Sequence, residues 1–185
     1  MGKIEDLAEK YSRHISLPWQ QTISGAQRII MLVYDKELER TLRARKKAFE
    51  TATQVADHKW IEVDITNAFA SWMADDEYRE AYFEAPEDLR LKLEAEFAQY
   101  VADQICIRLD MPEADASSVI AAFGSGSLFG LARVSQVLKL VEHKIKGRLV
   151  VFFPGQFEDN NYRLLDARDG WNYMAIPISL HGGGA

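Results

Sequence analysis

The chain has 185 residues, of which 48% are apolar and 27% are charged, and its formal net charge is −6 at pH 7. The single cysteine, Cys106, excludes an intrachain disulfide, and the four histidines lack the spacing of a zinc site. No apolar run approaches the ~18 residues that cross a bilayer, and the amphipathic N-terminus is not a secretory signal. These properties predict a soluble, cytoplasmic globular protein without a metal site or a membrane anchor.

The first third of the chain alternates helix and strand patterns. An amphipathic helix is predicted over residues 3–15, and it ends where Pro18 follows Leu17. The run RIIMLVY (28–34) is almost wholly apolar, which is typical of a strand covered on both faces. A long helix to about residue 56 is followed by KWIEVDI (59–65), whose alternating apolar residues predict a second strand.

Two helices are predicted next, separated by an acidic segment. Thr66 can cap the first helix, and Pro86 opens the second, which continues to about residue 109. The segment between them carries three aromatic rings, those of Tyr78, Tyr82 and Phe83. Aromatic residues within a polar rim are typical of protein interfaces, whereas inward-facing rings would belong to the core. The sequence leaves these two interpretations open.

The remaining strands complete the predicted fold. Strands are expected at 119–123 and 148–153, with a helix between them that Gly147 ends. Two more, 162–166 and 172–178, are expected to form a hairpin that extends or covers the sheet. The alternation predicts one three-layer α/β domain, with a mostly parallel central sheet flanked by helices. Its parts are the N-terminal helix and connection (1–27), the core (28–179) and a tail (180–185).

The glycine-rich loop GSGSLFG (124–130) leaves a predicted strand and precedes a helix, as phosphate-binding loops do. Its candidate anion-binding residues are Gly124, Gly126, Ser127 and Gly130. The loop lacks the Lys-Ser or Lys-Thr pair of a P-loop and has one residue too many for the dinucleotide fingerprint. A structural glycine turn is therefore favoured, with a degenerate nucleotide-binding or phosphate-binding domain as the alternative, and no cofactor is assigned.

Charged residues near the first two strands have two possible roles. Asp35 and Asp64 could together hold Mg²⁺, but turn and helix-capping roles are favoured for them. One helix carries a basic cluster that could contact DNA: Arg40, Arg43, Arg45, Lys46 and Lys47. Interleaved glutamates and the acidic net charge favour a solvated face instead. Because no catalytic constellation is complete, no catalytic residue is assigned and a non-enzymatic protein is expected.

Segment 154–173 is predicted to be a structured recognition edge. Its candidate partner-binding residues are Gln156, Asn160, Asn161, Arg163, Arg168 and Asp169. Amide and guanidinium groups form hydrogen bonds but are not suited to proton transfer, which favours binding over catalysis. The alternative is a self-contained hairpin, in which Asp169 fixes the turn and Arg163 is paired internally.

Five stretches resemble the BrxB family of BREX phage-defence systems: SLPWQQTISGAQRIIMLVYDK, EYREAYFEAPEDL, GSGSLFGLARVSQVL, GRLVVFFPG and RLLDARDGWNY. The resemblance covers essentially the whole chain, and the last stretch is its most specific part. It implies a small cytoplasmic bacterial protein encoded beside a methyltransferase, an ATPase and a PglZ-type phosphatase-like subunit. It also implies an assembly or adaptor role, with the PglZ-type subunit as the favoured partner. It transfers no catalytic residues.

Overall fold

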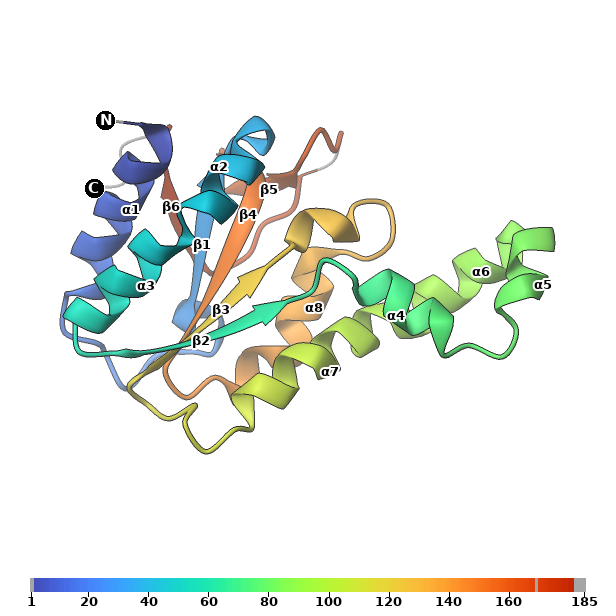
Figure 1. The fold of residues 1–185 in the computed structure, drawn as a ribbon, viewed down its shortest axis with the longest axis horizontal. Coiled ribbons are helices and arrows are strands. Elements are labelled where there is room, and N and C mark those ends of the chain that lie inside the picture. Colours follow the sequence, from blue (N-terminus) through green and yellow to red (C-terminus); the bar gives the residue numbers. More distant parts are fainter. Residues whose placement is uncertain (1, 169, 182–185) are drawn as a thin grey trace.

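Figure 1 shows the computed structural model, which describes residues 2–168 and 170–181. Within these residues a six-stranded, mostly parallel sheet has the order β2–β3–β4–β1–β6, with β5 paired to β4. The strands are β1 (Ile29–Tyr34), β2 (Lys59–Asp64), β3 (Ser118–Phe123), β4 (Arg148–Glu158), β5 (Asn161–Leu164) and β6 (Ile176–Ser179). The three-layer α/β class predicted from the sequence is confirmed.

The helices are α1 (Lys3–Ile15), α2 (Glu39–Ala44), α3 (Lys46–Val55), α4 (Ala68–Ala74), α5 (Arg79–Glu84), α6 (Pro86–Lys92), α7 (Ala98–Leu109) and α8 (Val134–Val141). Short 3-10 turns span Ala26–Arg28, Lys36–Leu38, Ser125–Leu128 and Glu142–Lys144, and a π-helical turn spans Leu93–Phe97. The long helix predicted before β2 is divided at Arg45 into α2 and α3. Across the described residues, each helix is too short or too polar to cross a membrane.

Strand β1 lies between β4 and β6 and is buried on both faces, as its apolar sequence predicts. Successive side chains of a strand point to opposite faces, so β1 contributes to two cores. Ile29, Met31 and Val33 belong to the core beneath α4, α7 and α8. The alternate residues of β1 belong to the core beneath α1, α2 and α3 (Figure 1).

The predicted hairpin between 162–166 and 172–178 is wrong in its pairing. Strand β5 instead pairs antiparallel with the end of β4, around a two-residue turn at Asp159 and Asn160. Both turn residues have positive φ, 51° and 63°, as the tightest hairpin turns require. Strand β6 takes no part in this hairpin. It pairs in parallel with β1 at the edge of the sheet. Among the residues that the structure describes, one bridge of the expected pairing is present, between Tyr162 and Trp171.

Strand β4 is longer than predicted because Pro154 and Gly155 do not end it. The Pro154 carbonyl accepts a hydrogen bond from the Leu165 amide at 2.9 Å, so the proline still takes part in the sheet through its acceptor. At Gly155 a Cβ atom would lie 2.1 Å from the Arg163 carbonyl oxygen. Glycine therefore permits the close approach of the two hairpin strands.

Residues 75–96, here called the arm, extend away from the sheet (Figure 1). The arm includes α5, α6 and most of the π-helical turn that joins α6 to α7. An aromatic cluster holds its base: the Phe97 ring lies 5.1 Å from Trp72 and 5.8 Å from Phe69. Lys92 donates a hydrogen bond to Asp76 and lies over the rings of Trp72 and Tyr82, at 5.8 and 5.5 Å. The arm is thus fixed to the body at its base.

Candidate functional site

The hairpin formed by the end of β4 and by β5 has one buried and one exposed face. Directly paired residues of an antiparallel ladder point to the same side, and the sides alternate along each strand. Gly155 pairs with Leu164 and Phe157 with Tyr162 on the inner face, where Tyr162 and Leu164 are buried. On the outer face, here called the polar hairpin face, lie four exposed residues: Gln156, Glu158, Asn161 and Arg163. Three of the predicted recognition residues therefore lie side by side.

The other predicted recognition residues have different positions. Asn160 is exposed in the turn, and its left-handed backbone conformation suits asparagine. Arg168 is exposed in the loop that follows β5, outside the polar hairpin face. Asp169 lies outside the described residues. The predicted strand 172–178 starts too early, because β6 begins at Ile176.

Tyr162 anchors the hairpin to the body of the protein. Its ring is fully buried between Phe153, Phe157 and Trp171, at centroid distances of 5.8, 4.6 and 5.1 Å. Its hydroxyl donates a hydrogen bond to the Ala175 carbonyl at 3.1 Å. Burial raises the pKa of Tyr162 well above its usual range, so the hydroxyl remains a donor at neutral pH. The polar hairpin face is thus mounted on a fixed support.

A groove of about 1100 Å³ lies beside the hairpin, at the carboxyl ends of β1 and β4. This is where open α/β sheets bind ligands. Its walls come from α1, from the hairpin segment 156–159 and from β6. Lys10 and Arg13 contribute positive charge, and Asp35 and Glu158 contribute negative charge. A groove with both signs of charge matches a mixed polar surface better than it matches a simple anion.

Sequence patterns did not reveal this groove. Its walls come from segments more than 160 residues apart, for example Lys10 and Ser179, whose ammonium and carbonyl groups form a 2.8 Å hydrogen bond. The position of β6 beside β1 brings them together. A local pattern in the sequence contains no signal for such a distant pairing.

The glycine loop forms a turn directly after β3, and this turn is held by contacts with neighbouring parts of the protein. Gly124 has φ 92°, and a Cβ atom there would lie 2.6 Å from the Thr66 backbone nitrogen. The Ser125 hydroxyl donates to the Phe152 carbonyl and the Ser127 hydroxyl to the Gly124 carbonyl, both at 2.7 Å. The helix that follows Gly124 is a single 3-10 turn of four residues. These contacts support the structural interpretation of the loop.

A smaller pocket of about 350 Å³ adjoins Gly124, Gly126 and Ser127. Two cations reach it, Lys36 and Arg43, and both already bind carboxylates. Lys36 pairs with Asp166, and Arg43 pairs with Glu39 at 2.9 Å and with Asp64 at 3.2 Å. A phosphate would have to compete with these acids. The pocket therefore gives the nucleotide-binding alternative little support.

We expect Gly124→Ala to lower the free energy of unfolding by about 2–3 kcal/mol, because it combines left-handed backbone strain with a clash against Thr66. The matched control is Gly130→Ala, where φ is also positive, at 75°, but no atom lies within 4 Å of the added Cβ among the described residues. That change should cost only about 1 kcal/mol. Urea denaturation of both variants measures the difference. Equal losses would show that the packing against Thr66 is not restrictive.

Asp35 and Asp64, the candidate magnesium ligands, are not brought together. Strands β4 and β3 separate β1 from β2, which places the two strand ends roughly 14 Å apart. Burial opposes the charge of Asp64, but hydrogen bonds from Thr66 and Arg43 lower its pKa overall. The Asp64 carboxylate accepts the Thr66 backbone amide at 2.9 Å in a local turn. The prediction that Thr66 caps α4 is wrong, because Asn67 is the N-cap residue and no side chain accepts a capping hydrogen bond there. Within the described residues, no three metal-binding side chains cluster.

The basic cluster of α2 and α3 is largely neutralised by acids. Besides Arg43, the paired residues are Arg45 with Glu5, Lys46 with Glu62 and Lys47 with Glu50. These pairs lie at distances of 2.9 to 3.3 Å. A surface of paired charges has few counterions to exchange for DNA phosphates. The pairing supports the solvated-face interpretation.

The fold and these surfaces define an α/β protein with an open groove and a fixed polar hairpin at the carboxyl edge of its sheet. A family model described as "BREX protein BrxB" matches residues 61–178, which is more than half of the chain. The chain therefore belongs to the BrxB family, as the resemblance predicted. Membership places it among the components of BREX phage defence and implies association with the other components. No curated protein and no solved structure matches the chain.

Proposed function

We propose that this protein is a non-enzymatic, cytoplasmic adaptor of a BREX complex and that it binds the PglZ-type phosphatase-like subunit. The observation that carries the proposal is the polar hairpin face, which presents Gln156, Asn161 and Arg163 together on a support fixed by Tyr162. Amide and guanidinium groups keep their hydrogen-bonding character at neutral pH. Such a surface suits recognition of a partner better than proton transfer.

The ionisable groups near the carboxyl edge favour the non-enzymatic part of the proposal. The Tyr34 hydroxyl donates a hydrogen bond to Glu39, and burial raises its pKa far above neutrality. Glu39 in turn accepts from Arg43, which also contacts Asp64. A catalytic acid or base needs a pKa near the working pH and a free position beside the substrate. These groups are instead committed to one another.

The test compares the wild type with the Arg163→Glu variant. Calorimetry measures the dissociation constant of each for the purified PglZ-type subunit. We expect the dissociation constant to rise by about tenfold or more, because a guanidinium that can bind a carboxylate bidentately becomes a like charge. Asn161→Ala should weaken binding less, by the loss of one or two hydrogen bonds. The melting temperature should stay unchanged, because both side chains are exposed on the polar hairpin face.

The matched control is Lys139→Glu, a charge reversal at an exposed position of α8, outside the hairpin. It should bind as the wild type does. Arg168→Glu tests whether the loop after β5 extends the contact surface. Wild-type affinity in Arg163→Glu, Asn161→Ala and Arg168→Glu alike would show that the hairpin is structural and that partners bind elsewhere.

A further inference from the structure

The arm leaves large apolar side chains in solvent. Tyr78, Phe83 and Leu91 are 64%, 73% and 66% exposed. They come from the start of the arm, from α5 and from α6. By contrast, Tyr82 is partly buried and packs beneath the Lys92 ammonium. The two interpretations of the aromatic segment therefore both apply, since Tyr82 faces inward while Tyr78 and Phe83 face solvent.

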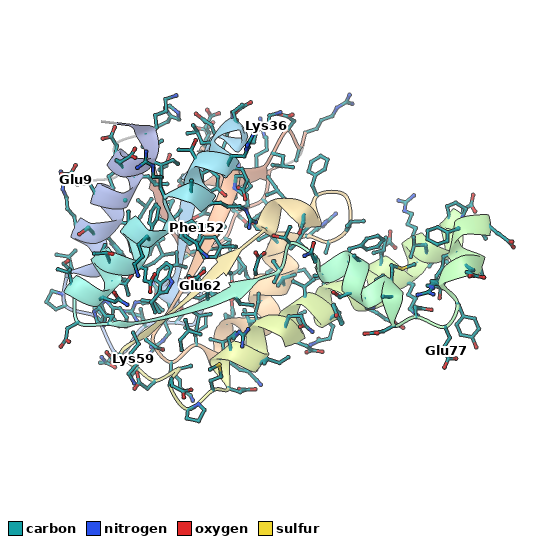
Figure 2. All side chains as sticks on the ribbon, in the orientation of Figure 1. Glu9, Lys36, Lys59, Glu62, Glu77 and Phe152 are labelled. Carbon is teal, nitrogen blue, oxygen red and sulfur yellow. The ribbon has the colours of Figure 1, made fainter. Side chains whose placement is uncertain are left out.

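The arm also concentrates the negative charge of the protein. Residues 75–96 include nine acids and three bases, a net charge of −6, which equals the net charge of the whole chain. The remainder of the chain is therefore balanced in charge. Glu77 marks this acidic segment in Figure 2, far from Glu9 and Lys59 on the body.

The three bases of the arm bind groups within it or at its base. Lys92 pairs with Asp76 and lies 3.8 Å from Glu96, and Arg90 pairs with Glu94 at 3.3 Å. Arg79 donates a hydrogen bond to the Ala74 carbonyl at 3.2 Å. Within the described part of the chain, no ion pair neutralises the other acids of the arm: Asp75, Glu77, Glu80, Glu84, Glu87 and Asp88. The exposed rings thus lie within an unneutralised acidic surface.

The base of the arm presents this surface in a defined position. The aromatic cluster of Phe69, Trp72 and Phe97 packs where the π-helical turn Leu93–Phe97 joins α6 to α7. Single π-helical turns within helices occur frequently at functional sites. An extended, anchored and acidic element with exposed rings has the features of one side of a protein interface.

We propose that the arm docks into an apolar cleft of a partner protein whose rim is lined by lysine and arginine side chains. Aromatic side chains are enriched among the residues that dominate binding energy, and Phe83 and Tyr78 would be such anchors. The unneutralised acids would meet a positive rim, which speeds association and selects the partner. Nucleic acid and anionic membranes are disfavoured because they carry the same sign of charge. A second copy is disfavoured because arms repel one another and the body is neutral overall.

This inference rests on the proposed function only for the identity of the partner, and it adds a contact surface distinct from the hairpin. A photoreactive benzoylphenylalanine placed at Phe83, in the full chain and in cells that carry the whole defence system, identifies what contacts the arm. The matched control places the same group at Val55, which is 81% exposed at the end of α3 on the body. We expect position 83, and not position 55, to crosslink one protein at an apolar segment flanked by Lys or Arg.

Two double variants then measure the contributions of apolar and charged groups to binding of the crosslinked protein. Tyr78→Ser with Phe83→Ser should weaken binding by about tenfold or more at any salt concentration. Glu80→Lys with Glu84→Lys should weaken it mainly at low salt, because salt screens exposed charges. Glu113→Lys, at an exposed position outside the arm, is the charge control. Unchanged melting temperatures exclude loss of folding.

The outcomes separate this proposal from the proposed function. If the wild type binds a BREX subunit and both arm variants bind it equally well, the arm proposal fails and the adaptor function stands. If position 83 crosslinks a protein outside the BREX system at a basic-rimmed apolar cleft, and the wild type binds no BREX subunit, the adaptor function fails and the arm proposal stands. Absence of any crosslink at position 83, or a crosslink to nucleic acid or to a second copy of the chain, overturns the arm proposal.

Discussion

Replacing Phe152 with alanine is expected to lower the free energy of unfolding by about 3–5 kcal/mol. Phe152 is fully buried in β4, where it stacks on Phe123 at 4.3 Å and contacts the edge of Phe49 at 5.1 Å. Figure 2 shows it in the interior, beneath the helices of the N-terminal half. Truncation would leave a cavity between two strands and α3, which neighbouring rings cannot fill without losing their own contacts.

Urea denaturation, monitored by fluorescence, measures this loss of free energy. The same loss should lower the melting temperature by roughly 10 °C for a chain of this size. The control is Phe152→Leu, which keeps most of the buried volume and should cost clearly less. A loss below about 1 kcal/mol in Phe152→Ala would mean that the core repacks around the site or that Phe152 is not central to it.

Replacing Gly155 with alanine is expected to cost about 3 kcal/mol and to separate β5 from β4. The added Cβ would lie 2.1 Å from the Arg163 carbonyl oxygen, and the Phe153 ring is also in contact at 3.0 Å. Because Arg163 and Gln156 are paired neighbours, the movement would displace the polar hairpin face as well. Under the proposed function, affinity for the PglZ-type subunit should fall together with stability.

Hydrogen exchange distinguishes local from global damage in this variant. Amides of β5 should exchange faster in Gly155→Ala, while amides of β3 should keep wild-type protection, because β3 pairs with residues 148–151 of β4 and not with the hairpin segment 155–158. Gln156→Ala is the matched control, since its side chain is exposed and its substitution should change stability by less than about 0.5 kcal/mol. Wild-type exchange of β5 in Gly155→Ala would show that the two strands tolerate a wider separation.

The central sheet was predictable because its sequence patterns are strong. The unbroken apolar runs of β1 and β3 require cover on both faces, and helical patterns between them require crossover connections. A sheet with helices on both faces is the arrangement that meets both requirements. Each of the four predicted core strands is present, with β4 extended past its predicted end.

The sequence predicts the wrong strand pairing for the hairpin because two turn signals compete in the same stretch. Asp169-Gly170 is the stronger signal by composition, yet the tight turn forms at Asp159-Asn160, where both residues adopt left-handed conformations. The position of a turn sets which side chains share a face, so the polar hairpin face could be predicted as a set of residues but not as a geometry. The direction of the arm could not be predicted from the sequence either. The apolar periodicity of α6 is the same whether the helix packs on the sheet or projects from it.

The position of β1 between β4 and β6 has a consequence for synthesis of the chain. Both of its sheet neighbours come late, β4 beginning at Arg148 and β6 at Ile176, so the apolar strand Ile29–Tyr34 is made long before either partner exists. At ribosomal speeds of about 5–20 residues per second, that interval is on the order of ten seconds. During it, both hydrogen-bonding edges of β1 lack their native partners, and exposed strand edges recruit other chains. The yield of folded protein is therefore expected to depend on how well β1 is shielded from other chains during synthesis, as well as on the final stability of the fold.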